Sequence, residues 1–160
     1  MKEIVLFIDN LQDIEPPDIP EGYAIRCFRD GDKKVWREVI HAAFAPIGGC
    51  PSNVVDREMA EEGWTPEQTF FGVIGDNPIA VTTAKKHPGS VSSPQTCKRC
   101  GRIGWTAVVP DHQCKGVGTA LLRMALIWFR DNGFDGVVCI PANREVAKFY
   151  EKIGFREIQG

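Results

Sequence analysis

The sequence predicts one α/β domain in which helices flank a mixed sheet. Apolar runs typical of strands alternate along the chain with longer segments whose apolar residues recur at helical spacing. Two of the strand-like runs are joined by the turn Gly75-Asp76-Asn77-Pro78, which predicts a hairpin. From residue 22 onward these patterns give the order β-α-α-β-β-β-α-β-α.

Length and composition limit the class of protein. The chain has 160 residues, enough for one domain with a substantial core. The formal net charge of −2 argues against nucleic acid as a partner. No apolar run approaches the roughly eighteen residues that span a bilayer, so we expect no membrane partner. The apolar start lacks a signal-peptide cleavage site, and we expect a cytoplasmic protein.

The N-terminal part of the chain differs from the rest. Residues 1–9 predict a strand, and residues 10–21 are rich in proline and predict an extended connector. We therefore divide the chain into a strand with its connector, residues 1–21, and a domain, residues 22–160.

Each element of the domain follows from its apolar pattern and its breakers. Asp30 or Asp32 can cap the first helix, and Gly133 and Gly154 end the last two. After Phe155 the chain has room for one short strand at most. The predicted strands span residues 23–28, 69–74, 79–84, 103–109 and 137–140, and the predicted helices span residues 33–44, 55–62, 117–132 and 143–153.

A glycine-containing loop stands between the strand at 103–109 and the helix at 117–132. Gly116 and Gly118 carry no Cβ, so a ligand can approach the backbone closely there. The first N–H groups of a helix have no internal partner and lie at its positive end, which suits a phosphate or pyrophosphate. The loop is neither a Walker loop nor a Rossmann fingerprint, and by itself it is also compatible with a simple tight turn.

A second pattern strengthens the interpretation of this loop. Asn143 is followed seven residues later by Tyr150 and then by Gly154-Phe155. Together with the pattern Gln113-x-x-Gly116-x-Gly118, it resembles the GNAT family of acyl-CoA-dependent N-acyltransferases over residues 22–160. The resemblance implies the GNAT fold, a central, mostly antiparallel sheet flanked by helices, and the element order predicted above is also that of this fold.

The resemblance also implies acetyl-CoA as co-substrate. The N–H groups at the start of the helix would bind its pyrophosphate, helped by the charge of Lys115. The strand edge at 106–108 would pair with the pantetheine amides, beside a bulge where neighbouring strands separate in the family. Asn143 would contact the cofactor, cap its own helix, or do both. The implied cofactor-binding residues are Thr106, Ala107, Val108, Gln113, Cys114, Lys115, Gly116, Val117, Gly118, Thr119 and Asn143.

Tyr150 matches the general acid of the family, which protonates the departing CoA thiolate. The alternative is a core aromatic, because Val146 and Ile153 share its helix face. The base is open. Many relatives place a Glu on the strand before Asn143 or on the strand before the loop, and neither region has a carboxylate here. A water chain or an imidazole, His112 or His41, remains as an alternative.

Two charge patterns bear on the acceptor. An acidic cluster in the segment that covers the acceptor site in the family predicts a rim that attracts a cationic amine, or simply a solvated helix face. Residues 77–110 contain no acid and several bases, which can meet the CoA 3′-phosphate, a partner, or nothing. The acids are Asp56, Glu58, Glu61, Glu62 and Glu67, and the bases are Lys85, Lys86, Lys98, Arg99 and Arg102.

The chain has six cysteines, spaced unlike those of a small disulfide scaffold. Cys27 and Cys139 lie in strand-like runs and are predicted in the core. Cys97 and Cys100 form a CxxC turn, which is half of a zinc knuckle. Because no second CxxC exists, we favour two ordinary thiols over zinc, a disulfide or a redox dithiol, and we assign no metal ligand. A homodimer is left open.

The main hypothesis is an N-acetyltransferase that transfers an acetyl group from acetyl-CoA to a primary amine of a small molecule or peptide, by direct attack in a ternary complex. The alternative is an inactive acyl-CoA-binding regulatory module that interacts through its basic CxxC loop. The missing carboxylate and the short C-terminal segment motivate this alternative. Family members usually continue through two C-terminal strands that form a wall of the substrate site.

Overall fold

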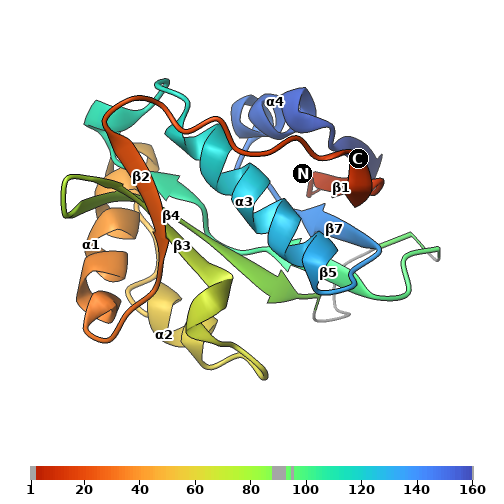
Figure 1. Cartoon of the computed structure of the whole chain (residues 1–160), viewed down its shortest axis with the longest axis horizontal. Coiled ribbons are helices and arrows are strands. Elements are labelled where there is room, and N and C mark those ends of the chain that lie inside the picture. The colour runs from red at the N-terminus through yellow and green to blue at the C-terminus, as the bar shows by residue number, and fades with distance from the viewer. Residues whose placement is uncertain (1–2, 88–92, 95, 160) are drawn as a thin grey trace.

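The computed structural model describes residues 3–87, 93–94 and 96–159. One sheet runs through the molecule in the order β2-β3-β4-β5-β7-β1-β8, and β6 pairs with β4 beside β5 (Figure 1). The ladder between β5 and β7 is parallel and the others are antiparallel, as the predicted fold class requires. The strands are β1 Val5–Ile8, β2 Tyr23–Cys27, β3 Thr69–Ile74, β4 Asn77–Lys86, β5 Cys100–Ile103, β6 Ala107–Val108, β7 Gly136–Cys139 and β8 Arg156–Gln159.

The helices lie on both faces of this sheet (Figure 1). They are α1 Asp32–Phe44, α2 Val54–Met59, α3 Val117–Asp131 and α4 Arg144–Ile153, so α2 ends three residues before its predicted end at residue 62. Gly133 and Gly154 follow the last two helices with positive φ, as predicted for C-terminal caps. No helix in the described ranges is long and apolar enough to cross a membrane.

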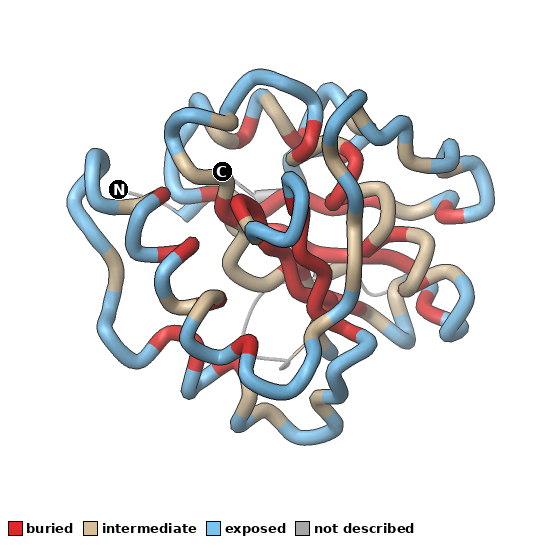
Figure 2. Tube along the Cα trace, turned by 60° about the vertical axis from the view of Figure 1, so that its left-hand side comes forward, coloured by how far each residue is buried: buried red, intermediate tan, exposed pale blue. Residues whose placement is uncertain are grey.

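The sheet separates two hydrophobic cores because successive strand residues point to opposite faces. Phe70 and Ala80 pack with α3 and α4, whereas Phe71 and Val81 pack with α1 and α2. Figure 2 shows the buried residues concentrated in the central strands and on the inner sides of the helices. Cys27 is exposed, so its predicted place in the core is wrong, whereas Cys139 is buried as predicted.

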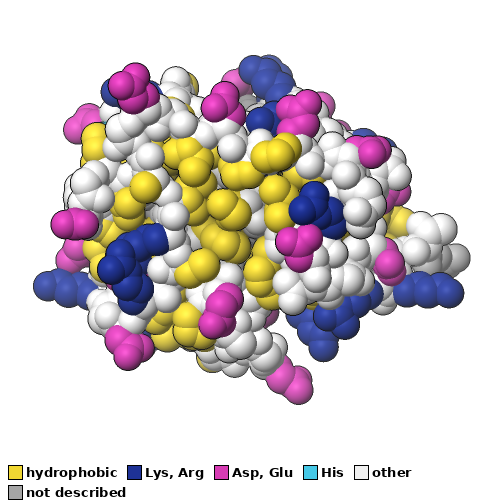
Figure 3. Space-filling view, in the orientation of Figure 1, with side chains coloured by type: hydrophobic (Ala, Val, Ile, Leu, Met, Phe, Trp, Pro, Cys, Tyr) yellow, Lys and Arg dark blue, Asp and Glu magenta, His cyan; other side chains and the backbone are white. Residues whose placement is uncertain are grey.

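One face of the molecule carries an apolar area. Figure 3 shows apolar side chains across the middle of the face that carries α3 and β2, with charged side chains mostly around its margin. Several hydrophobic residues that pack against the core of α3 stay partly exposed, among them Tyr23, Ile25, Met124 and Trp128.

The N-terminal strand completes the far end of the sheet. β1 lies between β7 and β8 and is antiparallel to both, with Leu6 opposite Cys139. β8 is the one short strand for which the sequence after Phe155 had room. Beyond β7 the sheet therefore continues through one strand from each end of the chain.

The single strand expected over residues 103–109 is divided. β5 pairs through Ile103 with Ala84, and β6 pairs through Ala107 with Val81. The three residues 104–106, between β5 and β6, thus lie opposite only the two residues 82–83 of β4. The extra residue is a β-bulge, which bends its strand and separates β6 from the neighbouring strand. The residue pattern of this segment does not reveal the break, and only the family resemblance implied a bulge here.

Gly101 provides a test of the packing between β5 and α3. A Cβ placed on Gly101 would overlap the ring of Phe129, which is fully buried. We expect Gly101→Ala to lower the free energy of unfolding by about 1–3 kcal/mol, because the core must shift to admit the methyl group. Urea denaturation measures this change. The control is Gly118→Ala, whose Cβ would lie at an ordinary contact distance of 3.4 Å from Val108 Cγ2. Equal midpoints for the two variants would contradict the packing.

Candidate active site

A cleft of about 1110 Å³ opens where β6 separates from β7. The segment 102–108 forms one wall, and residues 139–144 with Tyr150 of α4 form another. Phe44 ends α1, Ile47 lies in the 3-10 turn that follows it, and Glu3 and Ile4 lie just before β1. The chain just before β1 thus contributes residues to the cleft wall.

The edge of β6 that faces this cleft is unpaired. In the described chain β6 pairs with β4 alone, while β7 pairs with β5 and β1. Backbone groups that point outward from this edge are therefore open to an extended ligand, as at other exposed sheet edges, although the Val108 carbonyl already accepts a hydrogen bond from Gln113.

The loop before α3 has the backbone conformation expected of an anion site. Gly116 is the N-cap of α3 with φ of 92°, and Cys114 also has a positive φ, 61°. The first helical hydrogen bond at this end runs from the Ala120 N–H to the Gly116 carbonyl, so the preceding N–H groups lack helical partners. Gln113 fastens the loop to β6, because its Nε2 donates to the Val108 carbonyl at 2.9 Å.

The structure brings together half of the residues expected from the resemblance. Thr106, Ala107, Val108, Gln113, Asn143 and Tyr150 line the cleft. Residues 114–119 lie at the start of α3, outside the wall. Val117 is buried in the core beneath Gly72, so its backbone rather than its side chain is available to a ligand. Asn143 caps α4, because its Oδ1 accepts the Val146 N–H at 2.9 Å.

Tyr150 is both a core aromatic and a cleft residue. Its ring packs edge-on against Phe149 and Phe155. Its hydroxyl is hydrogen-bonded to the side chains of Thr106 and Cys139. Burial, reinforced by the neighbouring Cys139, raises the pKa of Tyr150 well above its ordinary value. The phenol therefore stays protonated throughout the neutral range and can donate.

Cys139 is a cleft residue whose contact with Tyr150 the sequence did not indicate. The residue is 2% exposed, and burial raises the pKa of its thiol to about 12. The thiol is therefore neutral at pH 7. This protonation state makes it a hydrogen-bonding neighbour of Tyr150 rather than a nucleophile.

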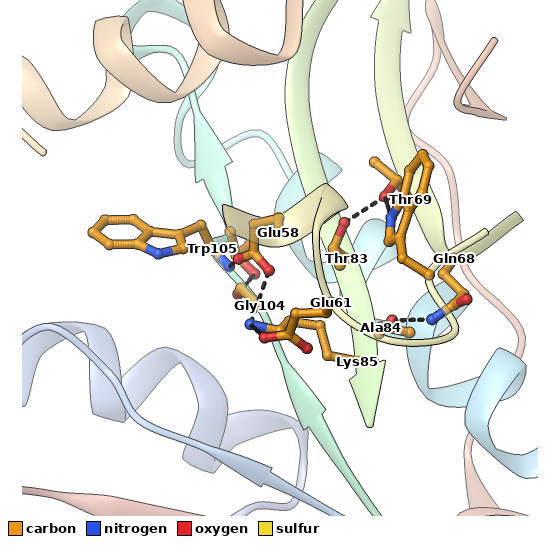
Figure 4. Close-up of polar contacts among 11 residues, drawn as sticks. Glu58, Glu61, Gln68, Thr69, Thr83, Ala84, Lys85, Gly104 and Trp105 are labelled. Atoms are coloured by element: carbon orange, nitrogen blue, oxygen red, sulfur yellow. Dashed lines mark hydrogen bonds and ion pairs between the residues drawn. The ribbon is translucent and has the colours of Figure 1, made fainter. Parts of the chain in front are cut away.

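One carboxylate of the acidic cluster enters the cleft. Glu58 lines it with a side chain only 2% exposed. Glu58 Oε1 accepts a hydrogen bond from the backbone N–H of Trp105 at 3.1 Å (Figure 4). Glu58 Oε2 lies 2.8 Å from Lys85 Nζ, and the same Nζ contacts Glu61 Oε1 at 2.7 Å. Asp56 instead turns to α1, where it pairs with Lys33 at 2.6 Å. The acidic rim predicted from the sequence is thus reduced, within the cleft, to Glu58.

Gly104 makes room for this carboxylate. A Cβ on Gly104 would lie 2.9 Å from Glu58 Oε1 and 2.8 Å from Lys85 Cδ. Sequence reasoning found no carboxylate on the strand, because Glu58 arrives from α2, far away in the chain. The glycine at position 104 was the only local signal, and by itself it indicates no particular neighbour.

The histidines considered as bases lie elsewhere. His112 Nδ1 is hydrogen-bonded to the Tyr23 hydroxyl at 2.7 Å, and His41 Nδ1 contacts Cys50 Sγ at 3.8 Å. Neither histidine is among the residues that line the cleft.

The CxxC turn lies on another part of the sheet. Cys97 and Cys100 are hydrogen-bonded to each other and pack with Val5, Phe7 and Val138. The backbone N–H groups of residues 98 and 99 donate to one carboxylate oxygen of Asp135. Among the described residues no three His, Cys, Asp or Glu side chains are grouped to hold a metal.

The sheet divided at a bulge, the free edge of β6 and the glycine-capped start of α3 are the features implied by the resemblance to acyl-CoA acyltransferases. A family model described as the acetyltransferase (GNAT) family matches residues 33–155. The chain therefore belongs to the GNAT acetyltransferase family.

Curated relatives are mycothiol acetyltransferases. The protein from Cellulomonas flavigena is 31% identical over 147 residues, which cover 87% of this chain and 42% of the relative. That from Propionibacterium freudenreichii is 30% identical over 142 residues, covering 86% of this chain and 44% of the relative. The chain thus spans less than half the length of these two relatives.

Solved structures share the fold. A GCN5-related N-acetyltransferase from Sphaerobacter thermophilus superposes with a TM-score of 0.75 at 19% identity, over 98% of this chain and 49% of that chain. A GNAT family acetyltransferase from Brucella melitensis, in complex with acetyl-CoA, gives a TM-score of 0.66 at 20% identity, over 86% of this chain and 89% of that chain.

Proposed function

We propose that the protein transfers the acetyl group of acetyl-CoA to a primary amine of a small molecule or peptide, by direct attack within a ternary complex. The observation that carries this proposal is the cleft itself. The unpaired edge of β6, the side chain of Tyr150 and the buried carboxylate of Glu58 all line it. A donor and an acceptor can therefore meet in one cavity without a covalent enzyme intermediate.

The donor would lie along β6 and the start of α3. The backbone of Thr106, Ala107 and Val108 would pair with the pantetheine amides. The N–H groups of residues 114–119 would bind the pyrophosphate, with Lys115 adding a charge-assisted contact. Gln113 would hold the loop in place, and Asn143 would add a contact from the cap of α4.

Tyr150 would protonate the departing CoA thiolate. The amine nitrogen forms a bond to the thioester carbonyl carbon, and the carbon–sulfur bond breaks with its electron pair on sulfur. The Tyr150 hydroxyl gives its proton to that sulfur, and a proton from the amine nitrogen restores the hydroxyl through water. A thiol is already a good leaving group, with a pKa of about 8.5, so this proton transfer assists the step.

A panel of primary amines and peptides tests the proposal. Release of free CoA from acetyl-CoA, followed with each amine, should identify at least one acceptor whose acetylated product appears in equal amount. Binding of acetyl-CoA without turnover on any member would instead favour the inactive binding module.

The glycine loop is tested with Gly118→Asp. A Cβ at this position would lie between Val108 of β6 and Phe149 of α4, and an Asp carboxylate would add negative charge next to the proposed pyrophosphate site. We expect acetyl-CoA affinity, measured by calorimetry, to fall by about 10-fold or more, which corresponds to about 1.4 kcal/mol. Gly118→Asn matches the size without the charge and should lose much less. Unchanged affinity in a folded Asp variant would show that the pyrophosphate lies elsewhere.

Tyr150→Phe removes the hydroxyl and keeps the ring, so packing should change little. Turnover should fall by about 10²–10⁴-fold if the phenol protonates the thiolate, and acetyl-CoA affinity should hold. The loss should shrink with an acyl donor whose thiol is more acidic, because that thiolate needs less assistance. Steady-state rates with both donors measure the effect. If the variant kept wild-type turnover with both donors, under conditions where the acyl-transfer step limits the rate, Tyr150 would be a core aromatic residue without a catalytic role.

A further inference from the structure

The cationic side chains on the wall of the cleft differ in how they are paired. Lys85 Nζ contacts two carboxylates, Glu58 at 2.8 Å and Glu61 at 2.7 Å (Figure 4). Arg144 lies 2.7 Å from a carboxylate of β8. Arg102 forms no ion pair and donates no hydrogen bond to any residue that the structure describes. Among the described residues of this wall, its guanidinium is thus the cation without a partner.

Arg102 lies on the same face of the sheet as the ion pairs of Lys85. The two residues are opposite each other in the antiparallel ladder of β4 and β5, and residues opposite each other project to the same face. The side chain of Arg102 is half-buried and lines the cleft. Acetyl-CoA is proposed to lie along β6, beyond the bulge that ends β5. Arg102 is therefore in the part of the cleft that remains for the acceptor.

Arg102 is also near the group that would act on the thioester. Its guanidinium interacts electrostatically with the Cys139 thiol, which is hydrogen-bonded to the Tyr150 hydroxyl. A group bound by Arg102 would therefore be close to the carbon that the amine attacks. An acceptor with one group on the guanidinium and its nitrogen at the thioester must carry the two groups a few bonds apart.

The chemistry of an unpaired guanidinium selects the kind of group. The acids of the wall do not satisfy it, because Glu58 is held by Lys85 and the Trp105 N–H, and no ion pair joins the exposed Glu3 to Arg102 in the described chain. A guanidinium presents its N–H donors in a planar fork, which fits the two oxygens of a carboxylate with parallel hydrogen bonds. The wall thus favours an acceptor that carries a carboxylate.

We propose that Arg102 binds a carboxylate of the acceptor, and that the acceptors are small amino acids whose amine lies within a few bonds of that carboxylate. This inference rests on the proposed function and names its substrate class. With the carboxylate held by the guanidinium, the amine nitrogen would be directed toward the thioester beside Tyr150. Phe44 and Trp105, whose ring centroids are 4.9 Å apart on the same wall, would border the side chain of the acceptor.

The test compares amino acids with the corresponding amino acid amides, which lack the carboxylate charge. The amides also have more acidic ammonium groups, so each variant is compared with wild type on the same substrate, which cancels this difference. Arg102→Gln should lower kcat/KM for the amino acid by about 10- to 100-fold, chiefly through KM, and for the amide by less than about 3-fold. Acetyl-CoA affinity, measured by calorimetry, should be unchanged.

Two further variants sharpen the comparison. Arg102→Lys keeps the charge but loses the planar fork, so its kcat/KM for the amino acid should lie between those of wild type and Arg102→Gln. Arg144→Gln is the matched control, because it removes the same charge from the same wall, but from a guanidinium that is already paired. Its kcat/KM should stay within about 3-fold of wild type for both substrates.

The outcomes separate this inference from the proposed function. A wild type that acetylates no primary amine overturns the proposed function and this inference with it. A wild type that acetylates amines but no amino acid overturns the role of Arg102 alone. An Arg102→Gln loss that is absent, or equal for amino acid and amide, does the same, because Arg102 would then not recognise the carboxylate. An Arg144→Gln loss as large and as specific for the amino acid would also overturn it, because the carboxylate would then respond to the overall charge of the wall.

Discussion

The functional site depends on a mismatch of one residue in strand pairing. β4 pairs with both β5 and β6, but residues 104–106 lie opposite only residues 82–83. The strand cannot remain flat across this mismatch, so β6 leaves the direction of β5 and its outer edge stays unpaired. The same bulge directs the Trp105 N–H toward α2, where Glu58 accepts it, and places Thr106 beside Tyr150. One backbone irregularity thus creates the cleft, its free edge and its polar contacts.

Burial gives the groups in this cleft their chemical character. Removal from water raises the pKa of Tyr150 and of Cys139, which keeps both neutral and able to share hydrogen bonds. Glu58 is held at a comparable depth by Lys85 and the Trp105 N–H. Buried charges are tolerated only when they are paired, and an unpaired partner would cost about 3–5 kcal/mol. The ion pair therefore allows a carboxylate to reach the interior of the cleft.

The ends of the chain meet at the far side of the sheet. The family match covers residues 33–155, yet β1 lies outside it and occupies the centre of the β7-β1-β8 ladder. Fully buried residues of β1 such as Leu6 show that this strand is part of the core. Residues 3 and 4 then continue from β1 into the cleft wall. A region that the sequence separated as a strand and connector is thus continuous with the site.

The sequence by itself determined the family, the fold class and most elements, because those depend on local signals: apolar periodicity, cap residues and the spacing of Gln113, Gly116, Gly118, Asn143 and Tyr150. It placed α3 and α4 within a residue or two and both of their terminal glycines. The tertiary structure alone decided where the strand at 103–109 divides, the exposure of Cys27, the place of β1 and the entry of Glu58. Each of these depends on which residues face one another across strands and helices. Glu58 and Gly104, for example, are far apart in the chain, and the residues around neither of them indicate that the two meet.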